Sequence, residues 1–124
     1  MKTEKELFIE NLKNRTRNFA IEVIVFCNSL KTVKASAVIT YQLVKSATST
    51  GANYRSACRA RSKAEFFSKI CIVVEEADES EYWLEIIEEA NLSDDKETLI
   101  KLKKEANEIT KIMSKAKNTA YESK

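Results

Sequence analysis

The chain contains no proline and a single glycine, Gly51, in 124 residues. Average proteins contain about 5% proline and about 7% glycine. These two residues make many of the tight turns in proteins, because proline fixes φ and glycine tolerates positive φ. A chain with so few turn residues has few ways to make tight turns. The sequence therefore predicts an all-α protein with short connections between its helices.

Length and composition are typical of one globular domain, which we expect to span residues 1–124. A chain of this length can bury a hydrophobic core without disulfides or metals. Apolar residues make up 44% and charged residues 32% of the chain, which fits amphipathic helices and excludes a disordered or membrane-spanning protein. The first residues lack the apolar core of a signal peptide, so a cytoplasmic location is expected.

The chain lacks the residues that most catalytic mechanisms use. Histidine is absent, which removes the commonest general base and the commonest transition-metal ligand. A single glycine cannot build a phosphate-binding loop or a nucleophile elbow. Cys27, Cys58 and Cys71 lack the paired spacing of a zinc site or redox motif, and we interpret them as small buried residues. The sequence predicts a protein without catalytic activity or cofactor, and a nuclease is a distant alternative.

Apolar residues recur every three or four positions along four segments, which is the period of an amphipathic helix. The expected helices span residues 4–30, 34–60, 63–91 and 94–119. Ser62 and Glu65 have the spacing of a capping box, and Ser93 or Asp94 is expected to cap the fourth helix. Four such helices with short connections predict an antiparallel up-down-up-down four-helix bundle.

The inner face of the second helix becomes small and polar from Ser46 onward. Gly51 on this helix costs roughly 1 kcal/mol relative to alanine. Either a neighbouring backbone crosses there or the helix bends. Asn53 is interpreted as a hydrogen-bonded polar residue of the core, and a ligand contact is the alternative.

The apolar stripe of the first helix is interrupted between Leu12 and Phe19, where the next step falls on Arg15 or Thr16. An arginine at the edge of an apolar seam needs a partner, because an unpaired buried charge is costly. In the alternative, the methylenes of Arg15 lie along the seam and its guanidinium reaches water.

Charge is strongly segregated along the chain, although the net charge is only +2. Residues 1–70 carry thirteen Lys or Arg and five acids, residues 71–97 carry one lysine and eleven acids, and residues 98–124 carry seven lysines and three acids. A face built from the first block can attract phosphate or an acidic surface. The acids of the third helix form a solvated face, meet cations of the bundle or of another copy, or, least expected, hold a metal.

Cations cluster around the junction of the second and third helices. Arg55 and Arg59 lie one turn apart, Lys45 is two heptads from Arg59, and Arg61 and Lys63 follow at the junction. Arginine forks onto phosphate oxygens, so the cluster suits contacts with nucleic acid. Ordinary solvated surface charge is the alternative.

Tyr82 and Trp83 lie on the third helix, whose core stripe is already filled by other residues. Aromatic residues outside a core are enriched at interfaces. Segregated charges suit a head-to-tail contact, which generates a ring if it closes. We expect Tyr82, Trp83 and Glu85 to form an oligomer interface, and the alternative is that Trp83 covers a loop of its own bundle.

Four segments of the chain resemble the proteins encoded in intervening sequences of bacterial 23S rRNA genes, and their relatives, the accessory variability determinants of diversity-generating retroelements. The matching segments cover much of the chain and are residues 13–20, 46–67, 75–85 and 105–108. The resemblance implies a four-helix bundle that forms homopentamers. For the retroelement branch it also implies association with template RNA and a reverse transcriptase.

The leading hypothesis is a non-catalytic oligomeric scaffold that binds RNA or DNA through a basic face. Its expected partners are copies of itself, a nucleic acid and, by the resemblance, a reverse transcriptase, with no membrane. The alternative is a protein-interaction module without a direct role in nucleic-acid binding. The resemblance also implies which residues bind nucleic acid, at positions that match the family's motifs or stand beside them. These residues are Arg15, Arg17, Lys45, Arg55, Arg59, Arg61 and Lys63.

Overall fold

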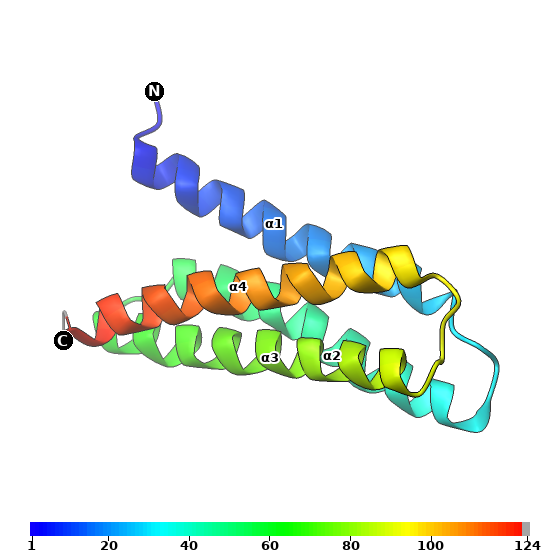
Figure 1. The fold of residues 1–124 in the computed structure, drawn as a ribbon. Helices are drawn as coiled ribbons and strands as arrows, with labels where there is room; N and C mark the ends of the chain where they lie inside the picture. Colours follow the sequence, from blue (N-terminus) through cyan, green and yellow to red (C-terminus); the bar gives the residue numbers. More distant parts are fainter. Residues whose placement is uncertain (123–124) are drawn as a thin grey trace.

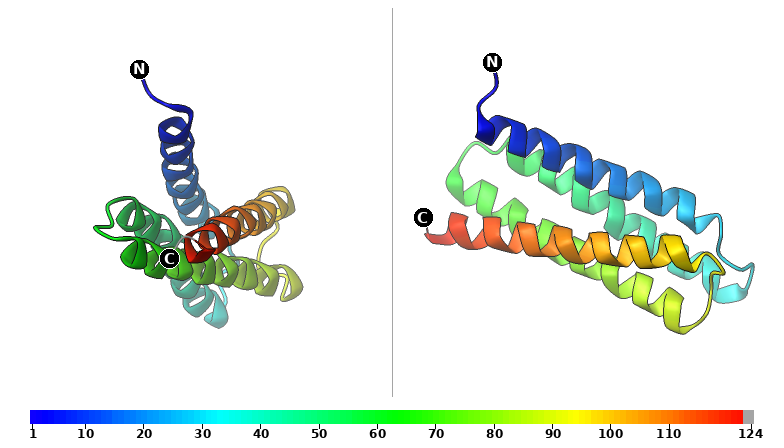
Figure 2. Two further views of the ribbon diagram at one scale, coloured as in Figure 1. Left: turned by 90° about the vertical axis from the view of Figure 1, so that its left-hand side faces the viewer. Right: turned by 45° about the horizontal axis from the view of Figure 1, so that its top comes forward.

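The computed structural model describes residues 1–122, which form four helices. These are α1 (Glu4–Cys27), α2 (Lys34–Cys58), α3 (Lys63–Glu89) and α4 (Lys96–Glu122). Successive helices run in opposite directions along one axis, as Figures 1 and 2 show. The predicted antiparallel four-helix bundle is therefore the fold. The helix ends differ from the expected ones by no more than three residues.

The core follows the apolar stripes expected from the sequence. Its largest side chains with no exposed surface include Leu43, Ile70, Leu84, Leu102 and Ile109. The four helices thus pack their apolar faces against one another.

In the part of the chain that the structure describes, no helix is both long enough and apolar enough to cross a membrane.

The core does not extend along the whole of α1. Phe8 lies in phase with the apolar stripe of this helix but is 58% exposed, whereas Leu12 is buried. Figure 1 shows the reason, because the N-terminal half of α1 diverges from α4. The three- and four-residue spacing from Leu12 back to Phe8 would extend the apolar stripe to Phe8, but the core ends at Leu12.

Small residues in the middle of α2 allow helices on both sides to approach closely. On one side, a Cβ atom added to Gly51 would lie 3.4 Å from the carbonyl carbon and oxygen of Thr16 in α1. On the other side, Ser46 and Ser80 are both fully buried, and the hydroxyl of Ser80 donates to that of Ser46 at 2.9 Å. A neighbouring backbone therefore crosses at Gly51, which is the first of the two alternatives.

Thr16 and Asn53 resolve two further ambiguities of the sequence. Thr16, rather than Arg15, fills the step in the core stripe of α1, and its hydroxyl donates to the carbonyl of Leu12 at 2.9 Å. Asn53 is half-buried and donates to the carbonyl and hydroxyl oxygens of Ser49 at 2.9 Å. Asn53 is hydrogen-bonded as expected, but Tyr54 takes the place in the core at this level.

The loops α1–α2 and α3–α4 are joined at one end of the bundle. The amide of Lys31 donates to the carbonyl of Leu92 at 2.7 Å, and the hydroxyls of Ser29 and Ser93 lie 2.9 Å apart. We call these contacts the loop tie. It connects segments far apart in the sequence, so the chain returns to the same place after α2 and α3.

Helix α3 ends in a Schellman motif. Asn91 has a φ of 55°, and the amide of Leu92 donates to the carbonyl of Ile87 at 3.0 Å. Asparagine adopts this left-handed conformation more readily than most residues. The single glycine of the chain is therefore not needed for this turn.

The caps of α3 and α4 can be compared with the predicted ones. The hydroxyl of Ser62 accepts a hydrogen bond from the amide of Glu65 at 3.1 Å, so Ser62 caps α3 as expected, but in residues 1–122 the Glu65 side chain does not complete the capping box. For α4 the expected cap at Ser93 or Asp94 is wrong, because Oδ1 of Asp95 accepts from the amide of Thr98 at 3.2 Å. The hydroxyl of Ser93 instead accepts from the amide of Asp95 within the loop, at 3.1 Å.

We expect Gly51→Ala to stabilise the protein by up to about 1 kcal/mol, because alanine favours a helix more than glycine does. The added methyl group would make an ordinary contact with the backbone of Thr16. Gly51→Leu should destabilise the protein, since the longer side chain must push α1 away from α2. Urea unfolding of the two variants measures both effects. A loss of stability in the alanine variant would contradict this description of the crossing.

Candidate nucleic-acid interface

Arg55, Arg59 and Arg61 line one open groove of about 280 Å³ at the junction of α2 and α3. All three arginines are exposed, and none forms an ion pair with another residue in 1–122. Ala52, Ser56 and the carboxylate of Glu65 complete the lining, and the small side chains of Ala52 and Ser56 leave the guanidinium groups accessible. We call this site the arginine groove.

The local fold explains why these cations come together. Helix α2 ends at Cys58 and α3 begins at Lys63, so a short connection turns the chain back on itself. Arg55 lies in the last turn of α2, where the helix dipole favours positive charge. Lys63 starts α3 beside the groove but is not among the residues that line it.

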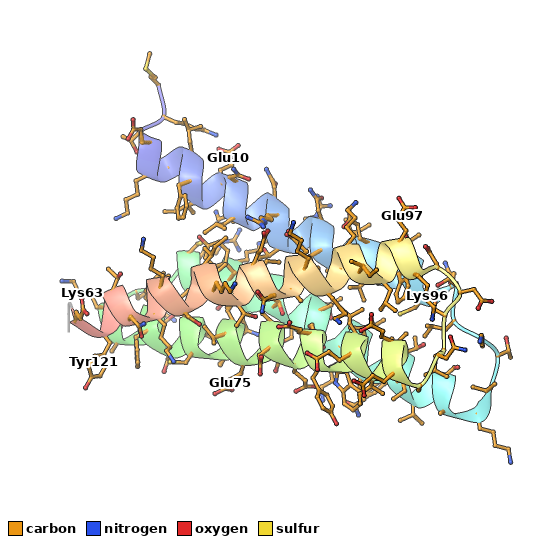
Figure 3. The ribbon with its side chains drawn as sticks, in the orientation of Figure 1. Glu10, Lys63, Glu75, Lys96, Glu97 and Tyr121 are labelled. Atoms are coloured by element: carbon orange, nitrogen blue, oxygen red, sulfur yellow. The ribbon has the colours of Figure 1, made fainter. Side chains whose placement is uncertain are left out.

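Positive charge also accumulates at this end of the bundle as a whole. The first turns of α1 and the last turns of α4 lie there too, whereas Lys96 and Glu97 mark the opposite end (Figure 3). When each helix is divided at its midpoint, the end with the arginine groove carries twelve Lys or Arg and seven acids. The opposite end carries eight Lys or Arg and twelve acids. The two sets are residues 1–15, 47–76 and 110–122, and residues 16–46 and 77–109.

Helix α1 adds cations close to the arginine groove. The backbone nitrogen of Arg17 would lie 3.6 Å from a Cβ atom added to Gly51. Gly51 precedes Arg55 by one turn of α2. Burial raises the pKa of the Cys58 thiol, and the positive charge of nearby Lys13 opposes this rise. Arg17 and Lys13 are exposed on α1 at the level of the C-terminal half of α2.

Lys45 lies apart from the arginine groove. Its Nζ atom is 6.0 Å from the centroid of the Tyr41 ring. Burial raises the pKa of the Glu76 carboxyl on α3, and the charge of Lys45 opposes that rise. Two heptads of helix separate Lys45 from Arg59 by about 21 Å along the axis, so a shared face does not make them neighbours.

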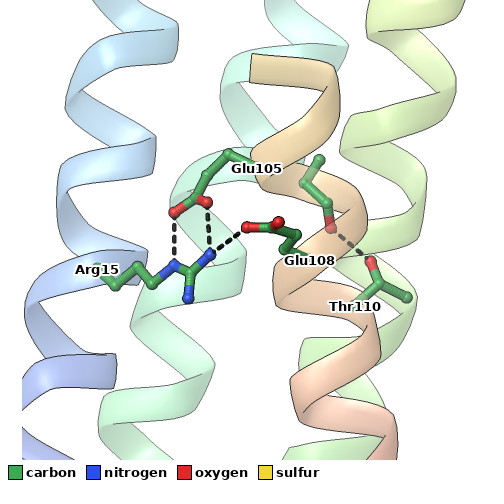
Figure 4. Close-up of polar contacts among 5 residues, drawn as sticks. Arg15, Glu105, Glu108 and Thr110 are labelled. Carbon is green, nitrogen blue, oxygen red and sulfur yellow. Dashed lines mark hydrogen bonds and ion pairs between the residues drawn. The ribbon is translucent and has the colours of Figure 1, made fainter. Parts of the chain in front are cut away.

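Arg15 is held by two carboxylates of α4, as Figure 4 shows. Its Nε atom donates to Glu105 at 2.8 Å, and its Nη2 atom donates to Glu105 and to Glu108 at 2.7 Å. These hydrogen bonds, above all those to Glu105, raise the pKa of Arg15. We call this contact the Arg15 clamp. The sequence suggested that Arg15 needs a partner, and Glu105 and Glu108 are its partners. Arg15 does not line the arginine groove.

Removing the forked contact of the Arg15 clamp should weaken the packing of α1 against α4. We expect Arg15→Lys to lower the free energy of unfolding by roughly 1 kcal/mol, because lysine cannot hold a carboxylate through two parallel N–H bonds. Glu105→Gln should have a similar effect, and the double variant should cost less than the two single effects added together. Urea unfolding measures all three. Additive effects would show that Arg15 and Glu105 do not stabilise each other.

Tyr82 and Trp83 make contacts of two different kinds. Tyr82 is 52% exposed, whereas Trp83 is half-buried against the core and donates from Nε1 to Glu79 at 3.1 Å. Their rings meet edge to face at 5.0 Å between centroids. Glu85 is exposed. Trp83 therefore packs partly on its own bundle, and Tyr82 and Glu85 remain available to another molecule.

Two exposed apolar residues near these aromatics were not predicted from the sequence. Val38 and Tyr41 of α2 are 61% and 63% exposed. Because Ser46 meets Ser80 and the two helices are antiparallel, Val38 and Tyr41 lie at the level of residues 85–88. Their position outside the apolar stripe of α2 is the signal that could have identified them.

Part of the acidic surface of α3 meets partners within the bundle. Lys103 donates to Glu88 at 2.6 Å, and this bond raises the pKa of Lys103. Asn107 donates to Glu81 at 3.3 Å. Over residues 1–122 no group of three acids or cysteines is arranged to hold a metal ion. Contacts with α4 thus account for some of the acids that the sequence left unexplained.

Similarity to known proteins is found in both sequence and fold. The family model for the 23S rRNA-intervening sequence protein matches residues 11–115. A crystal structure of a protein of unknown function from the S23 ribosomal protein family of Bacteroides thetaiotaomicron is similar, with a TM-score of 0.78 and 29% identity. The match covers 89% of this chain and 97% of that chain. No curated protein matches this sequence.

Proposed function

Because the chain belongs to the 23S rRNA-intervening sequence protein family, we propose that it is a non-catalytic, oligomeric scaffold that binds RNA or DNA in the cytoplasm. The observation that carries this proposal is the arginine groove, where Arg55, Arg59 and Arg61 lie together without an ion pair inside the described chain. Guanidinium groups fork onto phosphate oxygens, so three in one groove can hold successive phosphates.

The proposed contacts have a characteristic thermodynamic behaviour. Contacts with phosphate fix the position of a nucleic acid but carry little information about its sequence. Each neutralised phosphate releases counterions, so the logarithm of the affinity falls linearly with the logarithm of the salt concentration. Binding should therefore tolerate changes of sequence and be strongly sensitive to salt. The resemblance to retroelement accessory proteins supports a template RNA and a reverse transcriptase as partners.

We expect Arg55→Gln/Arg59→Gln to weaken binding of a labelled RNA hairpin and to flatten its salt dependence by about one unit for each phosphate that is no longer neutralised. Fluorescence anisotropy over a series of salt concentrations measures both quantities. Both arginines are exposed and glutamine favours a helix, so the free energy of unfolding should hardly change.

A matched control is Lys34→Gln/Lys104→Gln, which removes the same number of positive charges from exposed positions outside the arginine groove. This control should bind the hairpin almost as tightly as the parent. If the arginine variant keeps the affinity and the salt slope of the parent, the arginine groove is not the site. The protein-interaction module would then be the better description.

The oligomeric part of the proposal rests on the exposed surface around Tyr82 and on charges of opposite sign at the two ends. We expect light scattering to report a closed oligomer of about five chains of 14.1 kDa. Tyr82→Asp should dissociate it, because a charge would be buried without a partner. Ile100→Asp, at another exposed apolar residue, should not. A parent protein that is monomeric at micromolar concentration would contradict assembly.

A further inference from the structure

A second groove lies between α1 and α4, and the proposed function does not use it. Its volume is about 510 Å³, and residues of these two helices alone line it. The buried ring of Phe19 and the Arg15 clamp form part of its lining.

Three asparagines follow one another along the α1 side of this groove. They are Asn11, Asn14 and Asn18, and all three are exposed. Within residues 1–122 none of their side-chain amides forms a hydrogen bond. Each amide both donates and accepts, as the peptide group does. Asn11 and Asn18 are about 10.5 Å apart along the helix axis, which an extended chain spans with about three residues.

The charges that line the groove are balanced. Arg15 is paired with Glu105 and Glu108, and Lys101 lies 3.6 Å from Glu22. Lys104 is the remaining charged residue of the lining, so three cations face three acids. A polyanion would meet three carboxylates here, and a strongly basic segment would meet three cations. The balance therefore favours a ligand with little net charge.

We infer that the groove between α1 and α4 is a docking site for an extended peptide segment of low net charge from a partner protein. Asn11, Asn14 and Asn18 hold its main-chain N–H and C=O groups. A nucleobase could also pair with the amides, but its phosphates would approach the carboxylates of the lining. The site is separate from the arginine groove and does not depend on nucleic-acid binding.

Selection of short random peptides displayed on phage, with the full chain as target, tests this inference. Enriched peptides are synthesised with a fluorescent label, and their affinity is measured by anisotropy. We expect Asn14→Ala/Asn18→Ala to bind them about tenfold more weakly, because several hydrogen bonds to the peptide can no longer form. Asn118→Ala, at an exposed asparagine of α4 outside the groove, should bind as the parent does. Hydrogen exchange should show protection of residues 11–22 and 101–108 when peptide is bound.

The inference is overturned if no enriched peptide distinguishes the parent from the double asparagine variant. It is also overturned if that variant loses affinity for the labelled RNA hairpin but not for the peptides, because the groove would then belong to nucleic acid. Arg55→Gln/Arg59→Gln separates the two sites. Peptide binding should survive in this variant whether or not the RNA affinity falls.

Discussion

The close approach of α1, α2 and α3 around the middle of α2 is the contact on which the rest of the bundle depends. Gly51 leaves room for the backbone of α1. On the other side, the hydroxyl of Ser80 donates its proton to the hydroxyl of Ser46 and to the carbonyl of Glu76, and the hydroxyl of Ser46 donates to the carbonyl of Leu43. Among the described residues no buried side-chain polar atom lacks a hydrogen bond. Helix α2 is therefore fixed on two sides, and its outer face presents Arg55 and Arg59 from a rigid support.

The Arg15 clamp acts where this packing ends. Beyond Leu12 towards the N-terminus, α1 leaves α4 and exposes Phe8. The side chains of Arg15 and Glu105 are 31% and 24% exposed, so their desolvation is incomplete and two parallel hydrogen bonds can offset it. The clamp thus replaces hydrophobic contact between α1 and α4 with a polar one, and it lies in the lining of the groove between these two helices.

The sequence predicts features that depend on one helix at a time, and it fails where two helices must be placed relative to each other. The buried stripes of α3 and α4 follow from period alone. Gly51 indicates either a crossing or a bend, and only the structure shows that the backbone of α1 crosses there. The partners of Arg15 lie 90 and 93 residues away, and no periodicity reveals them. Lys45 shares a face with Arg59, but its place along the axis separates the two. The row of asparagines on α1 gave no signal, because exposed polar residues are expected on any helix of a bundle.

The loop tie has a mechanical consequence for α1. This helix is joined to the bundle at Lys31 and Leu92, touches α2 at Gly51, and is held again at Arg15. Its first turns, beyond these supports, form a free arm whose nearest support is the Arg15 clamp. Of the residues that line the groove between α1 and α4, only Asn11 and Asn14 lie on this arm, so bending of the arm changes the groove at one end. The residues that line the arginine groove all lie between Ala52 and Glu65, so bending of this arm leaves that lining unchanged.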